Sequence, residues 1–411
     1  MSAVKGFGKN AISLYAIQGL QYLSAVIVLP VLARKLNAPE FGELAYWQAL
    51  VGTLGLLIDY GFNYSAVRNV SRHADQPQLL GTIYRSTMAA RAILLVPAIL
   101  LLLAIPAWVG TSNDRTMQAL GLLMLIGMTL SPAWYLTGLR QTTLLAIASA
   151  ITALLTVVMT WVLVEGPQAL HIAAAIQFAA PLVTSLVAYA LVRRHAPVPP
   201  GRCSRTDIWS TLREGAPLFL TSASAGIYST LNPFLLGLVA APTQVAFFSL
   251  GERIARAARS LFSPLMAALF PYAVSHRKQD RPSNPWLART TGVTLLAAGV
   301  VSLGLIVTLP WIALPLFGHG YLAGVGVAQI LALNVAVVTA GNIKGVQGLI
   351  AQGRDKPVVY VTMLAAPLHI VAFLWAGSVF GAVGAAIAYV AIECLVTLSF
   401  YVIASRTATH A

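Results

Sequence analysis

Long apolar runs separated by short polar segments form the dominant pattern along the 411-residue chain. Most of these runs reach or exceed about 20 residues, the length that an α-helix needs to cross the hydrocarbon core of a bilayer. The pattern therefore predicts twelve transmembrane helices, with ends placed to within about four residues. The predicted spans are 11–33, 43–66, 84–108, 116–138, 141–163, 168–192, 214–240, 244–273, 288–312, 322–349, 357–379 and 381–404.

Composition agrees with a chain dissolved in lipid. Hydrophobic residues make up 58% of the sequence and charged residues only 9%, against about 25% charged residues in an average soluble protein. The twelve spans and their connections use almost the whole chain. We expect an all-α membrane protein without a sizeable water-soluble domain.

The net charge of +14 is explained by topology, because Lys and Arg are retained in cytoplasmic loops. With the N-terminus inside, 18 of the 26 basic residues fall on the cytoplasmic side and only Arg34, Lys35 and Arg115 fall in outer loops; the other five lie inside spans. Both termini are thus predicted to be cytoplasmic. The basic residues lie in short clusters between apolar runs, which argues against nucleic acid as a partner.

The longest predicted loop suggests how the chain is divided. It is cytoplasmic, basic and rich in proline, and it lies at the middle of the sequence. We expect an N-terminal six-helix lobe at 1–194, a linker at 195–213 and a C-terminal six-helix lobe at 214–411. Pro30, Ala38 and Pro39 recur as Pro233, Ala241 and Pro242 at a constant offset of 203 residues, a weak sign of tandem duplication.

The eighth span breaks the apolar pattern, because it contains Glu252, Arg253, Arg256 and Arg259. If 251–260 were a loop, the remaining apolar stretch would be too short to cross. At 100° per residue the four charges share one side of a helix, and each Arg facing lipid would cost about 2.5–3.5 kcal/mol. We interpret the three Arg as a cationic, substrate-binding surface of a water-filled cavity. A structural ion-pair cluster, or the cytoplasmic flank of a tilted helix, is the alternative.

Other charges also fall inside spans. Lys344 and Arg91 are further candidates for the cationic cavity, although Arg91 would equally neutralise Asp59. Asp59, Glu252 and Glu393 are intramembrane acids, which serve either in proton coupling or as counter-ions.

Catalytic chemistry is not indicated. The sequence contains no metal-ligand spacing, no phosphate-binding glycine loop and no nucleophile with a base nearby, and Cys203 and Cys394 lie far apart. We therefore expect neither an enzyme nor a bound cofactor or metal.

Six stretches, in order, resemble Wzx-type polysaccharide flippases, a family of the multidrug/oligosaccharidyl-lipid/polysaccharide exporter superfamily. They are Val31-Leu-Ala-Arg-Lys-Leu-Asn-Ala-Pro-Glu-Phe-Gly42, Leu57-Ile-Asp-Tyr-Gly-Phe62, Pro132-Ala-Trp-Tyr-Leu-Thr-Gly138, Arg213-Glu-Gly-Ala-Pro-Leu-Phe219, Leu316-Phe-Gly318 with Tyr321, and Gln352-Gly-Arg-Asp-Lys356. Each motif alone is short. Their shared order over nearly the whole chain, together with the number of spans, carries the resemblance.

The resemblance implies two six-helix lobes around a central cavity. It also implies a cargo, an oligosaccharide linked through diphosphate to undecaprenol. Such a flippase moves its cargo from the cytoplasmic to the periplasmic leaflet of a bacterial inner membrane, for O-antigen, capsule or exopolysaccharide synthesis. Other polysaccharide-assembly proteins are expected partners. The alternatives are a multidrug exporter of the same fold, whose cavity should favour acids, and a membrane polymerase or ligase, which should carry a large outer loop.

Overall fold

The computed structural model describes residues 27–109, 114–263, 265–266, 269 and 285–408, and within these ranges it is built of helices without a strand. Residues 27–35 are helical. The helices that follow are α2 (Ala38–Asp59), α3 (Phe62–Arg72), α4 (Pro77–Val109), α5 (Arg115–Leu130), α6 (Ala133–Gly138), α7 (Thr142–Leu163), α8 (Leu170–His195), α9 (Arg205–Thr230), α10 (Asn232–Gly237), α11 (Pro242–Ser260), α13 (Pro285–Phe317), α14 (Val325–Asn342), the π-helix η3 (Ile343–Ile350) and α15 (Asp355–Ala408). Single 3-10 turns, η1 (Pro167–Ala169) and η2 (His319–Gly324), precede α8 and α14.

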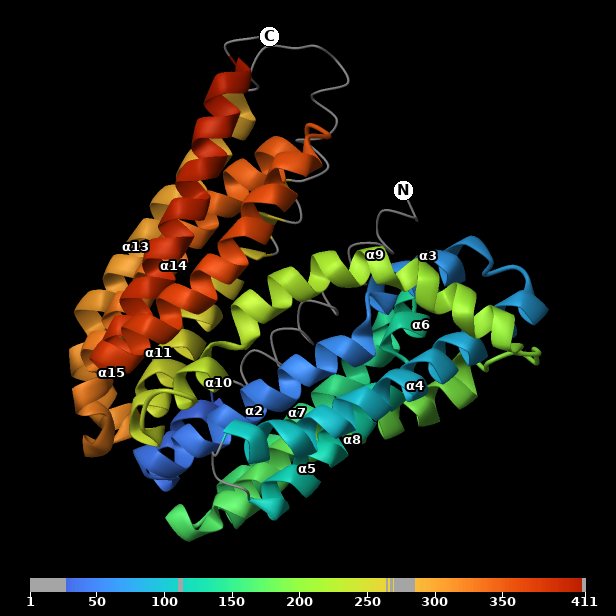
Figure 1. Ribbon diagram of the computed structural model, residues 1–411, viewed down its shortest axis with the longest axis horizontal. Helices are drawn as coiled ribbons and strands as arrows, with labels where there is room; N and C mark the ends of the chain where they lie inside the picture. Colours follow the sequence, from blue (N-terminus) through green and yellow to red (C-terminus); the bar gives the residue numbers. More distant parts are fainter. Residues whose placement is uncertain (1–26, 110–113, 264, 267–268, 270–284, 409–411) are drawn as a thin grey trace, which may run out of the picture. The chain divides into compact units, whose positions relative to one another are not determined.

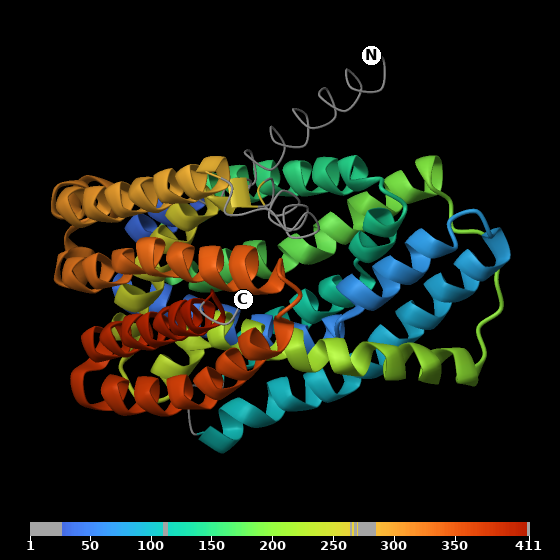
Figure 2. The ribbon, with the colours of Figure 1, turned by 90° about the horizontal axis from the view of Figure 1, so that it is seen from above.

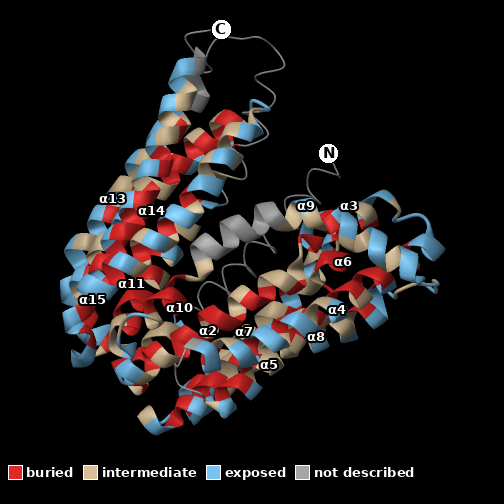
Figure 3. Ribbon diagram, in the orientation of Figure 1, coloured by how far each residue is buried: buried red, intermediate tan, exposed pale blue. Residues whose placement is uncertain are grey.

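Many of these helices turn an apolar surface outward. Among the described residues, eight helical stretches are long and apolar enough to cross a membrane. In the stretch Pro77–Trp108 the most apolar window has a mean hydropathy of 2.5, yet only 22% of it is buried inside the protein. Figure 3 shows the same division, with buried residues along the inner faces of the helices. Such a surface is stable against hydrocarbon and not against water, and the expected all-α membrane fold is confirmed.

Several predicted spans are interrupted helices. The stretch 357–408 is one element, α15, but Gly381 within it has a φ of 59° and divides it where the sequence predicts two spans. The seventh predicted span is α9 followed by the short α10. Residues 11–26 of the first span and most of the C-terminal end of the eighth lie outside the described residues.

The chain forms two compact units. Unit 1 comprises residues 1–36 and 47–231, and unit 2 comprises residues 37–46 and 232–411. Helix α9 packs against α3 and α4 inside unit 1. Within the predicted linker 195–213, residues 196–204 connect α8 to α9, and residues 205–213 form the first turns of α9. The division into two lobes of six helices at 195–213 stays a prediction.

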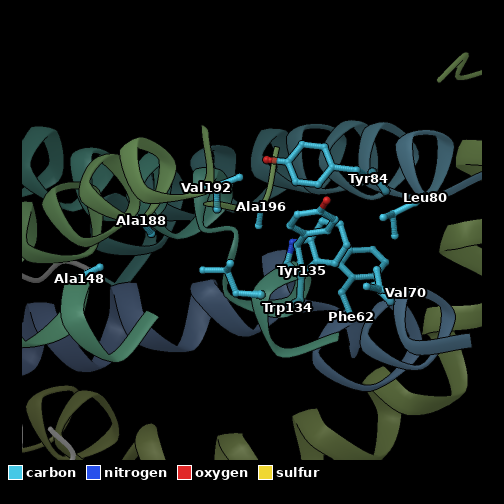
Figure 4. Close-up of a cluster of buried hydrophobic side chains, with 13 residues drawn as sticks. Phe62, Val70, Leu80, Tyr84, Trp134, Tyr135, Ala148, Ala188, Val192 and Ala196 are labelled. Atoms are coloured by element: carbon cyan, nitrogen blue, oxygen red, sulfur yellow. The ribbon is translucent and has the colours of Figure 1, made fainter. Parts of the chain in front are cut away.

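An aromatic cluster forms part of the core of unit 1 (Figure 4). Trp134 and Tyr135 of α6 are completely buried, and Tyr84 of α4 packs against both, with ring centroids at 5.5 and 5.0 Å. Gly138 ends α6 so close to α3 that a Cβ there would lie 2.5 Å from Val70. The aromatic motif at 132–138 is thus a packing element that joins α3, α4 and α6.

A left-handed bend separates α2 from α3. Tyr60 and Gly61 have φ angles of 40° and 74°. A Cβ on Gly61 would also lie 2.8 Å from the Cβ of Leu218 in α9, so this position requires glycine for both its conformation and its space. The motif at 57–62 therefore ends α2 and turns the chain into α3. Its glycine also allows α9 to pack closely against the turn.

Helix α14 is the centre of unit 2, since it packs against α11, α13 and α15. Figures 1 and 2 show α13, α14 and α15, in orange to red, running side by side. The first turns of α2 also belong to this unit: a Cβ on Gly42 would lie 1.8 Å from the carbonyl oxygen of Pro242, at the start of α11. Helix α11 is therefore closely packed against α14 and against the first turns of α2.

Candidate functional site

The charges of the eighth predicted span lie on one continuous helix. Helix α11 runs from Pro242 to Ser260 and carries Glu252, Arg253, Arg256 and Arg259. The reading of 251–260 as a loop is therefore wrong. The helix begins with Pro242 at its first position, where proline is favoured. The residues before Glu252 are mostly apolar, and the charged residues all lie in the second half of the helix.

The acid of this helix is committed to one of its arginines. Arg256 donates a hydrogen bond of 2.9 Å from Nη2 to Oε1 of Glu252, four residues earlier. The Glu252 side chain is 7% exposed, whereas that of Arg256 is 48% exposed. In this pair the acid is thus buried and the arginine is half exposed. As an i,i+4 pair it also stabilises α11.

Arg253 points to a different neighbour. Its guanidinium lies 5.4 Å from the ring centroid of Phe41, in the part of α2 that belongs to unit 2. This is the geometry of a cation–π contact. Arg253 does not line either of the two recesses described below, so the structure separates it from Arg256 and Arg259.

Arg259 lies where two recesses of unit 2 meet. The narrow recess lies between α11, α14 and α15 and is lined by Glu252, Arg256, Arg259, Asn334 and Tyr389, among others. Its volume is about 10 Å³, which is at most the space of one water molecule. The wide recess, with a volume of about 260 Å³, lies between the end of α11 and the end of α14 and shares only Arg259 with the narrow one.

In the described part of the chain, the wide recess is lined by several neutral polar residues and by one charged residue, Arg259. Its polar lining consists of Arg259, Ser263, Thr339, Asn342 and Gln347, and Phe262, Met266 and Val346 complete it. Among the described residues, no carboxylate lies within ion-pair distance of Arg259. The guanidinium is therefore available to an anion that enters this recess.

Lys344 lies on the π-helix η3 that continues α14. Its ammonium is 5.0 Å from the ring centroid of Tyr401 in α15. Lys344 lines neither recess. Lys344 therefore lies on the same helical stretch as Asn342 and Gln347 of the wide recess, but its charge lies against an aromatic ring.

Glu393 of α15 is 7% exposed and follows Tyr389, a lining residue of the narrow recess, by one helical turn.

Arg91 and Asp59 meet in unit 1. Nη2 of Arg91 lies 3.3 Å from Oδ1 of Asp59 and donates a hydrogen bond of 2.7 Å to the carbonyl oxygen of Met128. Nη1 contacts the carbonyl oxygen of Ser131 at 3.4 Å. Arg91 is only 3% exposed. Arg91 therefore pairs with Asp59, its predicted counter-ion, and contacts the end of α5. Both residues belong to unit 1, whereas the other cationic candidates, Arg253, Arg256, Arg259 and Lys344, belong to unit 2.

The uncharged polar residues of the site, Asn334 among them, were not identified by the sequence analysis. Asn334 of α14 is 3% exposed and lines the narrow recess, and both polar atoms of its amide lack a hydrogen-bond partner among the described residues. Asn334 is uncharged and lies in a mostly apolar span, so the pattern of charges along the sequence does not reveal it.

The described residues contain no group of three or more His, Cys, Asp or Glu side chains that could hold a metal ion.

The fold is shared with solved membrane transporters. The lipid II flippase MurJ, in an inward closed conformation, superposes with a TM-score of 0.72 over 95% of this chain and 86% of its own, at 12% identity. A mutant of the Vibrio cholerae MATE transporter VcmN superposes with a TM-score of 0.58 over 98% of both chains, at 14% identity. At these identities the likeness defines the fold, that of a multi-pass membrane transporter.

Sequence comparison gives the family. The profile of the family described as "Polysaccharide biosynthesis protein" matches residues 7–277, and the chain belongs to this family. A protein of Escherichia coli (strain K12) named "Putative O-antigen transporter" is 25% identical over 95% of this chain and 94% of its own. A protein of Shigella dysenteriae with the same name is 26% identical over 95% of this chain and 98% of its own. The expected resemblance to polysaccharide exporters is confirmed.

Proposed function

We propose that this protein is a flippase that moves an undecaprenyl-diphosphate-linked oligosaccharide from the cytoplasmic to the periplasmic leaflet of a bacterial inner membrane. The oligosaccharide would serve surface polysaccharide synthesis, and the protein acts as a transporter and not as an enzyme. The family and the two O-antigen transporter relatives support a polysaccharide precursor as the cargo. The N- and C-termini are proposed to be cytoplasmic, as the distribution of basic residues indicates.

One observation carries the proposal: α11 presents two arginines, Arg256 and Arg259, and of these two only Arg256 lies within ion-pair distance of a carboxylate among the described residues. Arg256 shares its charge with Glu252 but is half exposed, and Arg259 opens on the wide recess. Arginines in a membrane-embedded helix are costly and are kept where they serve a pathway or a ligand. A diphosphate has the charge and the geometry that guanidinium groups bind best.

The physical task of such a protein is to replace water around the headgroup. The sugars and the diphosphate cannot enter hydrocarbon without losing their hydrogen bonds to water, whereas the polyprenyl tail dissolves in it. Arg256 and Arg259 are proposed to hold the diphosphate during the passage. Arg253 and Lys344 are proposed to add to the positive potential around α11, and Arg91 to keep unit 1 intact.

The membrane potential is proposed as the driving force. Outward movement of a negative headgroup is favoured by an inside-negative potential, by about 2.3 kcal/mol per charge per 100 mV. Proton coupling through Asp59, Glu252 or Glu393 is the alternative energy source. Flipping by Asp59→Asn, Glu252→Gln and Glu393→Gln, measured with and without a pH gradient, separates the two: only coupling predicts that one of these variants loses its dependence on the gradient.

The test of the cargo site is a flipping assay in proteoliposomes with a fluorescent undecaprenyl-diphosphate-linked sugar. Arg259→Ala, and Glu252→Gln combined with Arg256→Gln, should each reduce the initial rate at least about tenfold, as expected when a charge-assisted contact is lost. The paired substitution removes both charges, so it avoids leaving Glu252 buried without its partner. Arg289→Ala, an exposed arginine of α13, is the matched control and should flip at the normal rate.

Normal flipping by both the Arg259 variant and the paired variant would refute the cationic site. A cationic drug, tested in the same vesicles, addresses the remaining alternative of a multidrug exporter. The proposal expects no drug transport, because the exposed charges of α11 are basic and would repel such a substrate.

A further inference from the structure

The wide recess of unit 2 has a chemistry that a diphosphate alone does not explain. Beside Arg259 it offers the hydroxyl groups of Ser263 and Thr339 and the amides of Asn342 and Gln347. These are neutral donors and acceptors. Neutral amides and hydroxyls also contact phosphate oxygens, but Arg259 is the only charged one among the described residues that line this recess, and neutral groups of this kind pair with the hydroxyls of a sugar.

Gln347 provides an independent sign of a ligand. It is 9% exposed, and its amide nitrogen donates a hydrogen bond of 2.6 Å to the carbonyl oxygen of Met266. This bond fixes the orientation of the amide. Its oxygen Oε1 is buried and has no hydrogen-bond partner among the described residues. A buried acceptor without a partner destabilises the protein, and a donor that binds in the recess beside Gln347 offsets that loss.

The backbone at this place is also unusual. Gln347 lies on η3, a π-helix, and π-helical turns within α-helices are rare and are frequently found at functional sites. The preceding α14 ends at Asn342, so the change of winding falls between the two amides of the recess. The Gln347 side chain reaches the carbonyl oxygen of Met266, six residues beyond the last residue of α11.

The size of the recess limits its occupant. Its volume of about 260 Å³ lies just below the range of roughly 300–1,000 Å³ of pockets for small molecules. A recess of this size suits a group of about the size of one sugar ring. Arg259 at its edge is the one residue that it shares with the narrow recess, which is too small for anything larger than water.

We propose that this recess binds the sugar next to the diphosphate of the cargo, with Arg259 on the adjoining phosphate, and that Asn342 and Gln347 determine which sugar is accepted. The amide of Gln347 binds a sugar hydroxyl, and the amide of Asn342, which lines the same recess, contacts the same sugar. This inference rests on the proposed function, because it assigns the specificity of the same site. It also predicts that sugars further along the chain are not read here.

Transport of three lipids tests the inference: undecaprenyl diphosphate without sugar, the same lipid with N-acetylglucosamine, and the same lipid with galactose. The wild-type protein should flip one sugar lipid about tenfold faster than the other, as for a site built to pair a particular hydroxyl. Asn342→Ala and Gln347→Leu should reduce that ratio to about two or less. Gln329→Leu, on the same α14 but bonded to the carbonyl of Ile306, is the matched control and should keep the ratio.

A cysteine measurement does not depend on those variants remaining active. Asn342→Cys, combined with Cys203→Ser and Cys394→Ser, places a single thiol at the recess. The preferred sugar lipid should slow its modification by a small thiol reagent, and undecaprenyl diphosphate alone should not. Equal protection by both lipids, or an unchanged sugar ratio in both amide variants, would overturn the sugar recess while the flippase stands. Failure of the wild-type protein to move any of the three lipids would overturn the proposed function itself, and the recess with it.

Discussion

Arg91 of α4 donates a 2.7 Å hydrogen bond to the main-chain carbonyl of Met128, in the last turn of α5. The last carbonyls of a helix have no partner within it, so Arg91 completes the end of α5 while it pairs with Asp59. A buried charge in this position holds three segments of unit 1 together. Its geometry is that of a structural anchor.

The first prediction follows from that anchor. Arg91→Ala should lower the stability of the detergent-solubilised protein by about 1–3 kcal/mol, because buried acceptors lose their donor. Thermal unfolding should show this as a clearly lower midpoint, whereas Arg259→Ala should unfold close to the wild type. A stable Arg91→Ala protein that has lost flipping would instead place Arg91 in the transport pathway.

The second prediction concerns the start of unit 2. Gly42→Ala should prevent correct folding, because its Cβ would lie 1.8 Å from the carbonyl oxygen of Pro242, an approach that real atoms do not make. Overpacking of this kind costs about 1–3 kcal/mol or more. The yield of monodisperse protein in size-exclusion chromatography measures it.

Gly292→Ala provides the control for this substitution. Gly292 lies on α13, and a Cβ there meets no atom within 4 Å. The change should leave the yield unchanged or raise it slightly, since alanine is the better helix former. Equal yields of the two variants would contradict the close packing of α2 on α11.

The third prediction concerns the capping of α5 by Asp114. The carboxylate accepts hydrogen bonds from the backbone amides of Thr116 and Met117, at 2.8 and 3.1 Å, and one of 2.7 Å from His171. Partial burial raises the pKa of Asp114, but these hydrogen bonds outweigh burial and lower it below its usual value of 3.8. Asp114→Ala should cost about 0.5–2 kcal/mol at neutral pH.

The pH dependence of this contribution has a definite sign. Because the pKa of Asp114 is lower in the folded state, its stabilisation is complete above the unfolded value of 3.8 and is lost as the pH falls through and below it. The difference in unfolding midpoint between the wild type and Asp114→Ala should therefore shrink as the pH falls from about 5 towards 3. A difference that grows between pH 5 and pH 3 would exclude the capping role.

The fourth prediction tests the topology with a native thiol. Cys203 is exposed and lies between α8 and α9, on the predicted cytoplasmic side. In a Cys394→Ser background, a membrane-impermeant maleimide should label Cys203 in inverted vesicles and not in intact spheroplasts. Burial and the carboxylate of Asp207 raise the pKa of the thiol, so labelling should be faster at pH 8.5 than at pH 7. Labelling of intact spheroplasts would reverse the orientation.

Two parts of the fold follow directly from the sequence, the membrane location and the helical class. Runs such as 84–108 are too long and too apolar for any environment except lipid, and the structure turns them outward with little burial. The continuity of α11 was also predictable, because a loop at 251–260 would have left too little apolar chain to cross. The i,i+4 pair of Glu252 and Arg256 follows from helical spacing alone and is present.

The membrane fold, the charged helix and the family resemblance were thus determined by the sequence itself, because they depend on composition and on spacing along one element. Only the tertiary structure decided which charges act together. It placed Arg91 with Asp59 and α5, Arg253 against Phe41, Lys344 against Tyr401, and Arg259 beside Asn342 and Gln347. The reason is physical: the environment of a side chain is set by the faces that neighbouring helices turn toward it, and residues 32 or more positions away along the chain supply those faces.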